Sequence, residues 1–316
     1  MTGTPLDLTP FGPLLKALGL LYWALALAVA GLALWLPKSW WLKLPLAALV
    51  LAAFIVPVAG HVQQQGAQRD AAQERLDASM ALFQERCKTA GERITRTVEN
   101  VEGVVWMKWR DQEVNYQDQF KLDDPYGADC GLEGCIVLLL KSKDAASRFP
   151  ESAKRHAGRY DYVQSIDPED GRPYQYTGHP KSVKEESPEE FSRYVRSTGI
   201  GAEPDGSYLA LKKTLLVNGL TARYGVTWDD ISTREDREHW IAGSSLKVLD
   251  LRTNEVIAER IGYMIDRGQG SQAGFRSPWG YANETACPEK IDVAGNRTQV
   301  GFTARFVNKV LNATRD

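Results

Sequence analysis

Residues 37–43 read PKSWWLK, a short polar stretch between two long apolar runs. Residues 17–36 contain no charged side chain, and neither do residues 44–60. Because a helix rises about 1.5 Å per residue, about 20 apolar residues cross a hydrocarbon core of roughly 30 Å. The sequence therefore predicts a short N-terminal tail over residues 1–16 and a transmembrane hairpin made of residues 17–36 and 44–60.

The basic residues near this hairpin indicate which side of the membrane each part occupies. Lys38 and Lys43 lie in or beside the connecting loop, whereas the first ten residues contain no basic residue. Loops on the cytoplasmic side are enriched in Lys and Arg. We therefore expect the loop inside a bacterial cell, and the N-terminus and the C-terminal domain in the periplasm. A cleaved signal peptide is the alternative, and the second apolar run argues against it.

The cysteines give a second indication of the compartment. Three pairings are possible among the four of them, which are Cys87, Cys130, Cys135 and Cys287. The sequence CGLEGC makes a close pair at residues 130–135, which leaves Cys87 for Cys287. Free thiols and a metal site are the alternatives, but the C-x4-C spacing and the scattered histidines do not match a zinc site. Disulfides persist in oxidising compartments, so they agree with the periplasm.

The amphipathic segment after the hairpin predicts a helical stalk over residues 61–94. Its apolar side chains recur at steps of three or four residues, at Ala72, Leu76, Met80, Phe83, Cys87, Ala90 and Ile94. This stripe either packs on the chain's own domain, which we favour, or pairs with a second copy as a coiled coil. In the second case the stalk would form a homo-oligomer.

From residue 95 onward the pattern changes to short strands separated by turns. Residues 104–109 and 136–140 are apolar runs of strand length. Residues 159–165 and 172–177 flank a turn sequence and predict a hairpin. Ser187-Pro188 is typical of a helix start, with Ser187 as the N-cap.

The C-terminal third has the clearest strand signals. Asn218-Gly219 separates residues 208–217 from residues 220–228 and predicts a tight hairpin. Residues 246–251 and 256–265 predict a second hairpin, and an apolar stripe from Phe302 predicts a closing helix. The fold class we expect is α+β: a transmembrane hairpin, a helical stalk, and a strand-dominated antiparallel β-rich domain over residues 95–316. A subdivision near residues 180–200 stays open.

Common catalytic motifs are missing from the sequence. It contains no Walker loop, no H-E-x-x-H and no G-x-S-x-G. Ser244-Ser-Leu-Lys247 fits S-x-x-K, but it enters a predicted strand and lacks the partner motifs, so we interpret it as chance. The sequence has no basic stripe of the kind that would indicate nucleic-acid binding. No cofactor or metal is expected.

The charged segment at residues 228–240 is the main candidate for a binding surface. It reads WDDISTREDREHW, and its candidate side chains are Trp228, Asp229, Asp230, Arg234, His239 and Trp240. Trp and Arg are favoured anchors at interfaces, which points to a protein partner. A solvated connection between two hairpins is the plainer interpretation, with internal ion pairs that contribute little.

Several segments of the sequence resemble segments of known proteins. They are RTVENVEGV, FKLDDPYGADCG, RYGVTWDDISTREDREHWIAGSSLKVLDL and ERIGYMIDRGQGS. The chain resembles membrane-anchored proteobacterial proteins of the kind found beside antibacterial effector genes. The resemblance covers most of residues 80–290, carries no catalytic motif, and implies a periplasmic immunity or accessory role.

Together these patterns predict an inner-membrane-anchored periplasmic binding protein that is not an enzyme. Residues 17–60 would contact the lipid bilayer, and a protein would be the partner. One alternative is a structural component of an envelope-assembly or secretion complex that oligomerises through residues 61–94. Another is an envelope hydrolase, for which Asp229, Asp230 and His239 would be the first catalytic candidates.

Overall fold

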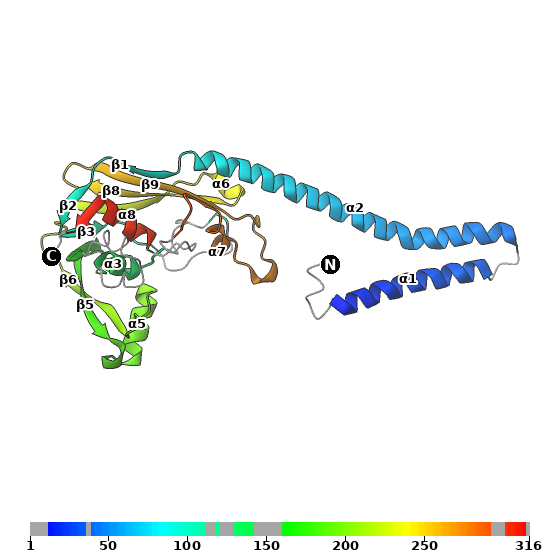
Figure 1. The fold of residues 1–316 in the computed structure, drawn as a ribbon, viewed down its shortest axis with the longest axis horizontal. Helices are drawn as coiled ribbons and strands as arrows, with labels where there is room; N and C mark the ends of the chain where they lie inside the picture. Colours follow the sequence, from blue (N-terminus) through cyan, green and yellow to red (C-terminus); the bar gives the residue numbers. More distant parts are fainter. Residues whose placement is uncertain are drawn as a thin grey trace. The chain divides into compact units, whose positions relative to one another are not determined.

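A computed structural model describes residues 12–35, 39–110, 118–120, 129–141, 160–291 and 301–313 (Figure 1). The chain divides into two compact units, Met1–Arg75 and Leu76–Asp316. The second unit contains the whole of residues 180–200, where the sequence left a subdivision open.

The first unit contains helix α1 (Gly12–Trp35) and most of helix α2 (Trp40–Cys87). Both helices are long and apolar enough to cross a membrane. They contact each other through Tyr22, whose hydroxyl donates a 2.8 Å hydrogen bond to the carbonyl of Phe54. Helix α1 begins at Gly12, so it includes residues that the sequence assigned to the N-terminal tail. Pro37 and Lys38 of the connecting loop lie outside the described residues.

Helix α2 is one continuous helix that ends at Cys87, seven residues before the predicted end of the stalk. Residues 91–94, predicted as helix, are instead strand β1 (Gly91–Ile94), which pairs antiparallel with residues 258–261. Pairing with a distant strand therefore outweighs the helical spacing of Ala90 and Ile94, because periodicity over one turn is a weak signal.

The second unit is built around a mixed sheet of nine strands. Its strand order is β1-β9-β8-β7-β3-β4-β5-β6, with β10 also paired to β9. These strands are β3 (Gly103–Trp106), β4 (Tyr162–Ile166), β5 (Pro173–Ser182), β6 (Ser207–Leu215), β7 (Tyr224–Asp230), β8 (Ile241–Asp250), β9 (Glu255–Ile265) and β10 (Ala286–Cys287). A second, parallel pair joins β2 (Val98–Val101) to β11 (Leu311–Ala313).

Short helices connect these strands. They are α3 (Glu133–Leu140), η3 (Val183–Glu185), α5 (Pro188–Thr198), α6 (Arg234–Glu238), η4 (Ala273–Phe275), α7 (Pro278–Ala282) and α8 (Phe302–Val310).

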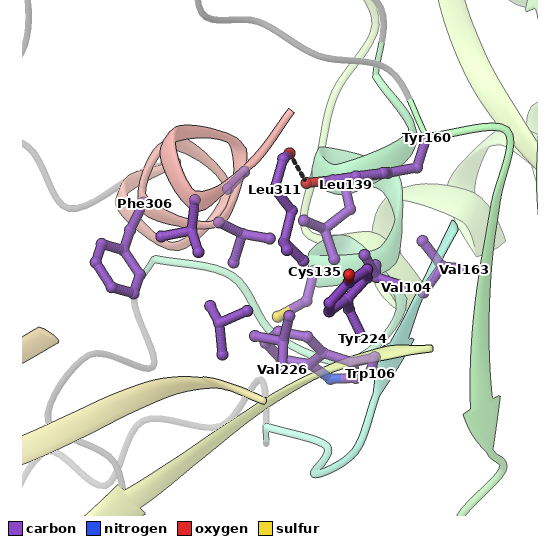
Figure 2. Close-up of a cluster of buried hydrophobic side chains, with 14 of the residues drawn as sticks. Val104, Trp106, Cys135, Leu139, Tyr160, Val163, Tyr224, Val226, Phe306 and Leu311 are labelled. Carbon is purple, nitrogen blue, oxygen red and sulfur yellow. Dashed lines mark hydrogen bonds between the residues drawn. The ribbon is translucent and has the colours of Figure 1, made fainter. Parts of the chain in front are cut away.

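Helices α3 and α8 cover one face of the sheet and form the main core with it (Figures 1 and 2). Successive side chains on a strand point to opposite faces. On β8, Leu246 and Val248 therefore point into this core, while Ile241 lies on the other face. There it packs with Phe83 from the end of α2. The stalk stripe from Met80 onward thus packs on the chain's own domain, as favoured from the sequence.

Three strand predictions are wrong. Residues 136–140 form helix α3, because a short continuous apolar run fits a buried helix as well as a strand. Strands β6 and β7 do not pair with each other: β6 pairs with β5, and β7 pairs with β3 and β8. The sheet is mixed and not purely antiparallel, since β3 is parallel to both β4 and β7.

The predicted hairpin around Asn218-Gly219 does not form, and hydrogen bonds to a neighbouring strand explain why. Gln164 on β4 is 1% exposed, and its side-chain oxygen accepts hydrogen bonds from the backbone N–H groups of Thr221 and Ala222, at 2.7 and 2.9 Å. The segment after Asn218-Gly219 is therefore held on β4 and does not return along β6. The β4–β5 and β8–β9 hairpins, helix α5 with its Ser187 N-cap, and helix α8 are confirmed.

Candidate functional site

The segment at residues 228–240 contains the end of β7, helix α6 and the start of β8. Thr233 begins α6 with a capping box: its hydroxyl accepts from the N–H of Asp236 at 3.1 Å, and Asp236 accepts from the N–H of Thr233 at 2.8 Å. This reciprocal arrangement satisfies two backbone donors that a helix start leaves without partners. The capping box therefore favours the start of this five-residue helix at Thr233.

The two tryptophans that frame this segment belong to the interior. Trp228 is 3% exposed and lies in the main core, and Trp240 is 6% exposed and lies 5.2 Å from the ring of Trp279. Neither is available as an aromatic anchor at a surface. The candidate partner surface therefore includes neither Trp228 nor Trp240.

The charged side chains of the same segment are engaged by separate partners. Asp229 binds Lys247 at 2.8 Å, and Asp230 binds Arg237 at 2.7 Å. His239 Nδ1 lies 2.8 Å from the hydroxyl of Ser79. These contacts hold the residues in the fold, and they do not direct the two carboxylates and the imidazole toward one reacting atom. Asp230 and Arg234 are exposed, and Arg234 pairs with Glu238 and lies over the ring of Phe120.

The same segment forms the junction between α2 and the domain. Arg86 donates from Nε to Oδ1 of Asp236 at 2.7 Å, and the carboxylate of Asp236 is buried. This hydrogen bond to Asp236 raises the pKa of Arg86. The buried hydroxyl of Ser79 contacts His239 and also donates to Gln269 at 3.1 Å. One turn beyond Phe83, Cys87 forms a disulfide with Cys287.

We call this set of contacts, made by Ser79, Phe83, Arg86 and Cys87, the α2 junction. An ion pair, a buried hydroxyl, an apolar side chain and a covalent bond all join the last two turns of α2 to the domain. Sequence reasoning found Phe83 and Cys87 through the apolar stripe but missed Ser79 and Arg86. Both lie three or four residues from Phe83, a spacing that places them on the same helix face.

A loop held by hydrogen bonds to Asp266 follows β9 beside this junction. The buried carboxylate of Asp266 accepts hydrogen bonds from the N–H groups of Gly268 and Gly270, and it forms an ion pair with Arg276. This pairing raises the pKa of Arg276. A pocket of about 390 Å³ lies here, lined by Leu76 of α2, Arg276 and neighbouring residues. The loop after β9 and helix α2 therefore line one pocket, which also contains charged side chains.

The second disulfide joins Cys130 to Cys135 and closes the turn before α3. Beside it, the buried side chains of Arg110 and Asp129 both contact Thr303 at the start of α8. Arg110 donates to the Thr303 hydroxyl at 2.9 Å, and Asp129 accepts from the Thr303 N–H at 2.6 Å. These contacts position α8 against the core.

The structure places Ser244 and Lys247 on opposite faces of β8, as strand alternation requires, so they form no nucleophile–base pair. Within the described ranges, no group of three or more His, Cys, Asp or Glu side chains could hold a metal ion.

No protein-family model matches the chain, and no curated protein and no solved structure matches it. The fold defines the class: an α+β protein with two long apolar helices followed by a domain with a mixed nine-stranded sheet and two disulfides.

Proposed function

We propose that this chain is an inner-membrane-anchored binding protein whose disulfide-braced domain lies in the periplasm. The observation that carries the proposal is the α2 junction. A helix that starts with apolar, membrane-length sequence ends in a disulfide to the domain, between Cys87 and Cys287. Such bonds persist in oxidising compartments, and cytosolic thiols are kept reduced.

The α2 junction also supports a role in which the helix holds the domain in place for a binding partner. The end of α2 from Leu76 onward belongs to the same compact unit as the domain and is fixed to it by several contacts, so the domain is held as one body with this end of the helix. A binding protein benefits from this, since a pre-organised surface loses little conformational freedom when a partner docks.

The partner we propose is a protein, and the role is immunity against, or assistance to, a secreted antibacterial toxin. The toxin link rests on the sequence resemblance. The lack of a shared reacting centre among Asp229, Asp230 and His239 favours binding over hydrolysis, since each of them has its own structural partner.

The envelope-assembly alternative depends on a stalk that pairs with a second copy. The structure weakens its basis, because Met80 and Phe83 pack against the chain's own sheet. Residues 63–75 consist of Gln, Gly, Ala and charged residues and contain no large apolar side chain for a coiled-coil seam.

A competition experiment tests the immunity role. The gene is deleted from its host, and the deletion strain is grown in contact with the parent strain. We expect the parent to kill the deletion strain, and we expect full rescue by a plasmid copy. Equal survival of the deletion strain, under conditions in which the parent kills an unrelated sensitive strain, would contradict immunity.

A further inference from the structure

Strand β6 forms one edge of the nine-stranded sheet (Figure 1). It runs over nine residues, from Ser207 to Leu215, and pairs antiparallel with β5 on one side. Among the described residues, no strand pairs with its other side. The opposite edge of the sheet is β1, which has only four residues. Strand β6 is therefore the longer of the two edges.

The hydrogen bonds at the two ends of the β5–β6 pair show which residues of β6 face outward. At one end, the carbonyl of Gly206 accepts from the N–H of Val183 at 2.9 Å. At the other end, the N–H of Leu216 donates to the carbonyl of Pro173 at 2.9 Å. Backbone groups of a strand point alternately to its two sides, so the even-numbered residues face β5. The odd-numbered residues direct their N–H and carbonyl groups away from it.

The turn before β6 satisfies the first of these outward residues. The N–H of Ser207 donates to the carboxylate of Asp205 at 2.8 Å, and its carbonyl accepts from the N–H of Glu203 at 2.8 Å. The other outward residues of the strand are Leu209, Leu211, Lys213 and Leu215. We call residues 209–215 the β6 edge. An extended polypeptide offers donors and acceptors at the same two-residue spacing, which makes it the matching ligand.

The two strands of this hairpin differ in how open their edges are. Strand β5 pairs with β4 only from Pro173 to Tyr176, so the second side of residues 177–182 faces no described strand. Pro180 faces that side and has no N–H to donate there. Proline on an edge is a common protection against further pairing. Strand β6 contains no proline, so the hairpin protects the β5 side and leaves the β6 edge able to pair.

The core holds β6 in a fixed conformation. Leu209 and Leu211 pack against the main core. Buried Tyr208 contacts the rings of Phe191 and Tyr194 of α5, with ring centroids 5.3 and 4.6 Å apart. A strand that is already ordered loses little conformational freedom when a peptide docks on it, which favours binding.

Two lysines determine which kind of peptide fits the β6 edge. Lys213 forms an ion pair with Asp167, and its ammonium lies 4.1 Å from the centre of the Tyr174 ring, so it is drawn back over β5. Lys212 is exposed and lies on the opposite face of the strand, because successive side chains alternate. The exposed ammonium of Lys212 favours an acidic side chain beside it.

The same lysine disfavours a second copy of this chain as the occupant. Two copies paired antiparallel about Leu211, the central residue of β6, would set their Lys212 side chains diagonally beside each other. Diagonal neighbours lie about 7–8 Å apart, within reach of long side chains, and like charges at that distance repel. Charge complementarity therefore favours a different, acidic chain.

We propose that the β6 edge binds an extended acidic segment of the protein partner, which adds a strand to the sheet. The segment's backbone would pair with the outward residues of β6. Its alternate apolar side chains would contact Leu211 and Leu215, and an acidic side chain on the other face would pair with Lys212. The proposal rests on the proposed function, because it assigns a docking surface to the protein partner.

A synthetic peptide of alternating valine and aspartate tests the proposal. The peptide acetyl-VDVDVDV-amide matches residues 209–215 in length and supplies one apolar and one acidic face. It carries a fluorophore and is titrated with the detergent-solubilised full chain, while fluorescence anisotropy reports binding. We expect saturable one-to-one binding, and at least tenfold weaker binding of the matched basic peptide acetyl-VKVKVKV-amide.

Two N-methylated forms of this peptide test the backbone pairing. In an antiparallel arrangement the valines lie opposite the outward residues of β6, so the N–H groups of the valines face β6 and those of the aspartates face solvent. A parallel arrangement reverses these roles. We therefore expect methylation of one set to weaken binding about tenfold or more, and methylation of the other set to change it less than threefold.

Four variants locate the peptide on β6. Leu215→Pro removes an outward N–H without removing a hydrogen bond to β5, and should weaken binding at least threefold relative to Leu215→Ala. Lys212→Glu should also weaken it at least threefold, whereas Arg267→Glu, at an exposed residue after β9, should leave the affinity unchanged. Because Lys212 is exposed, its variant tests the β6 edge even if Leu215→Pro fails to fold.

The proposal is overturned if the aspartate peptide does not bind, if the two methylated peptides bind equally, or if Lys212→Glu binds as well as Arg267→Glu. A wild-type homodimer that Leu215→Pro dissociates would assign the edge to a second copy and overturn it too. Killing of the deletion strain without peptide binding would reject the β6 edge and leave immunity standing. Peptide binding with equal survival of the deletion strain would reject immunity and leave the β6 edge standing.

Discussion

The side chain of Arg86 at the end of α2 donates a 2.7 Å hydrogen bond to the buried carboxylate of Asp236 in α6, 150 residues further along the chain. The bond ties the helix that precedes the sheet to the connection between β7 and β8. Asp236 also accepts from the N–H of Thr233, so the same carboxylate caps α6 and holds α2. The α2 junction and the capping box are thus one hydrogen-bond network.

The first prediction concerns this ion pair. Arg86→Met leaves the carboxylate of Asp236 buried without its cation, and a half-satisfied buried pair is strongly destabilising. Because the Arg86 side chain is 28% exposed, we expect the free energy of unfolding to fall by about 1.5–3 kcal/mol, the range for a hydrogen bond to a charged group, measured by denaturant unfolding of the full chain in detergent. The control is Arg234→Met, an exposed arginine paired with Glu238 four residues away, which should cost less than about 0.5 kcal/mol. Equal costs for both variants would contradict the structural role of Arg86.

The second prediction compares the two disulfides. The Cys87–Cys287 bond closes a loop 200 residues long in sequence, whereas Cys130–Cys135 closes one of only five. In the loop-entropy model the long bridge stabilises by up to about 5 kcal/mol and the short one by up to about 2 kcal/mol. Replacing Cys87 and Cys287 by Ala should therefore lower the urea midpoint more than replacing Cys130 and Cys135. The reverse order would show that the junction bond contributes little.

The third prediction concerns the close approach of α3 and α5. A Cβ added at Gly134 would lie 2.1 Å from the backbone carbonyl oxygen of Thr198, which cannot move without displacing α5. Overpacking of this kind costs about 1–3 kcal/mol, so we expect Gly134→Ala to lower the free energy of unfolding by about that amount. At Gly201 an added Cβ meets no atom within 4 Å, and Gly201→Ala is the matched control. Wild-type stability of Gly134→Ala would contradict the packing of α3 on α5.

The fourth prediction is a pH dependence at Asp250. The buried carboxylate accepts from the Arg223 guanidinium at 2.7 Å and from Arg96 at 2.9 Å. Hydrogen bonding to Arg223 is the main reason that the pKa of Asp250 falls to about 2. Because the pKa of Asp250 is lower in the folded state than in the unfolded state, ionised Asp250 stabilises the folded protein at pH values above its unfolded-state pKa. This stabilisation is lost as the pH falls toward the folded-state pKa. We therefore expect wild-type stability to decline between about pH 4 and pH 2.

Asp250→Asn tests this assignment. The variant should be less stable than the wild type at neutral pH, and the difference in unfolding free energy should shrink as the pH falls from 4 to 2. Denaturant unfolding at a series of pH values measures the difference. A difference that stays constant through this window would show that ionised Asp250 does not contribute.

The sequence predicted those elements that are stabilised by interactions between residues close together in the chain. Ser187-Pro188 starts α5 because a side-chain cap and a fixed φ act within one turn. The β8–β9 hairpin was predictable because its turn directly joins two paired strands. The cysteine pairing followed from the close spacing of Cys130 and Cys135, which left Cys87 and Cys287 as partners.

The missed features depend on residues that are far apart in sequence. Asn218-Gly219 is a strong hairpin signal, but pairing of β6 with β5 and the hydrogen bonds from Gln164 determine the path of the chain. Residues 136–140 have no period that distinguishes a buried helix from a buried strand.

The central claim is that the apolar hairpin spans the inner membrane with its loop inside and the domain outside. Because all four cysteines are disulfide-bonded, a single added cysteine supplies the one reactive thiol. Val217→Cys places that thiol in the domain at a position that is 92% exposed, and Ser39→Cys places it in the exposed loop between α1 and α2.

Labelling of intact cells with a membrane-impermeant maleimide that passes the outer membrane is the most direct test. We predict that Val217→Cys is labelled in intact cells and that Ser39→Cys is labelled only after lysis. Labelling of Ser39→Cys alone in intact cells would invert the topology and contradict the account. Labelling of neither variant before lysis would place the domain in the cytoplasm and contradict it equally.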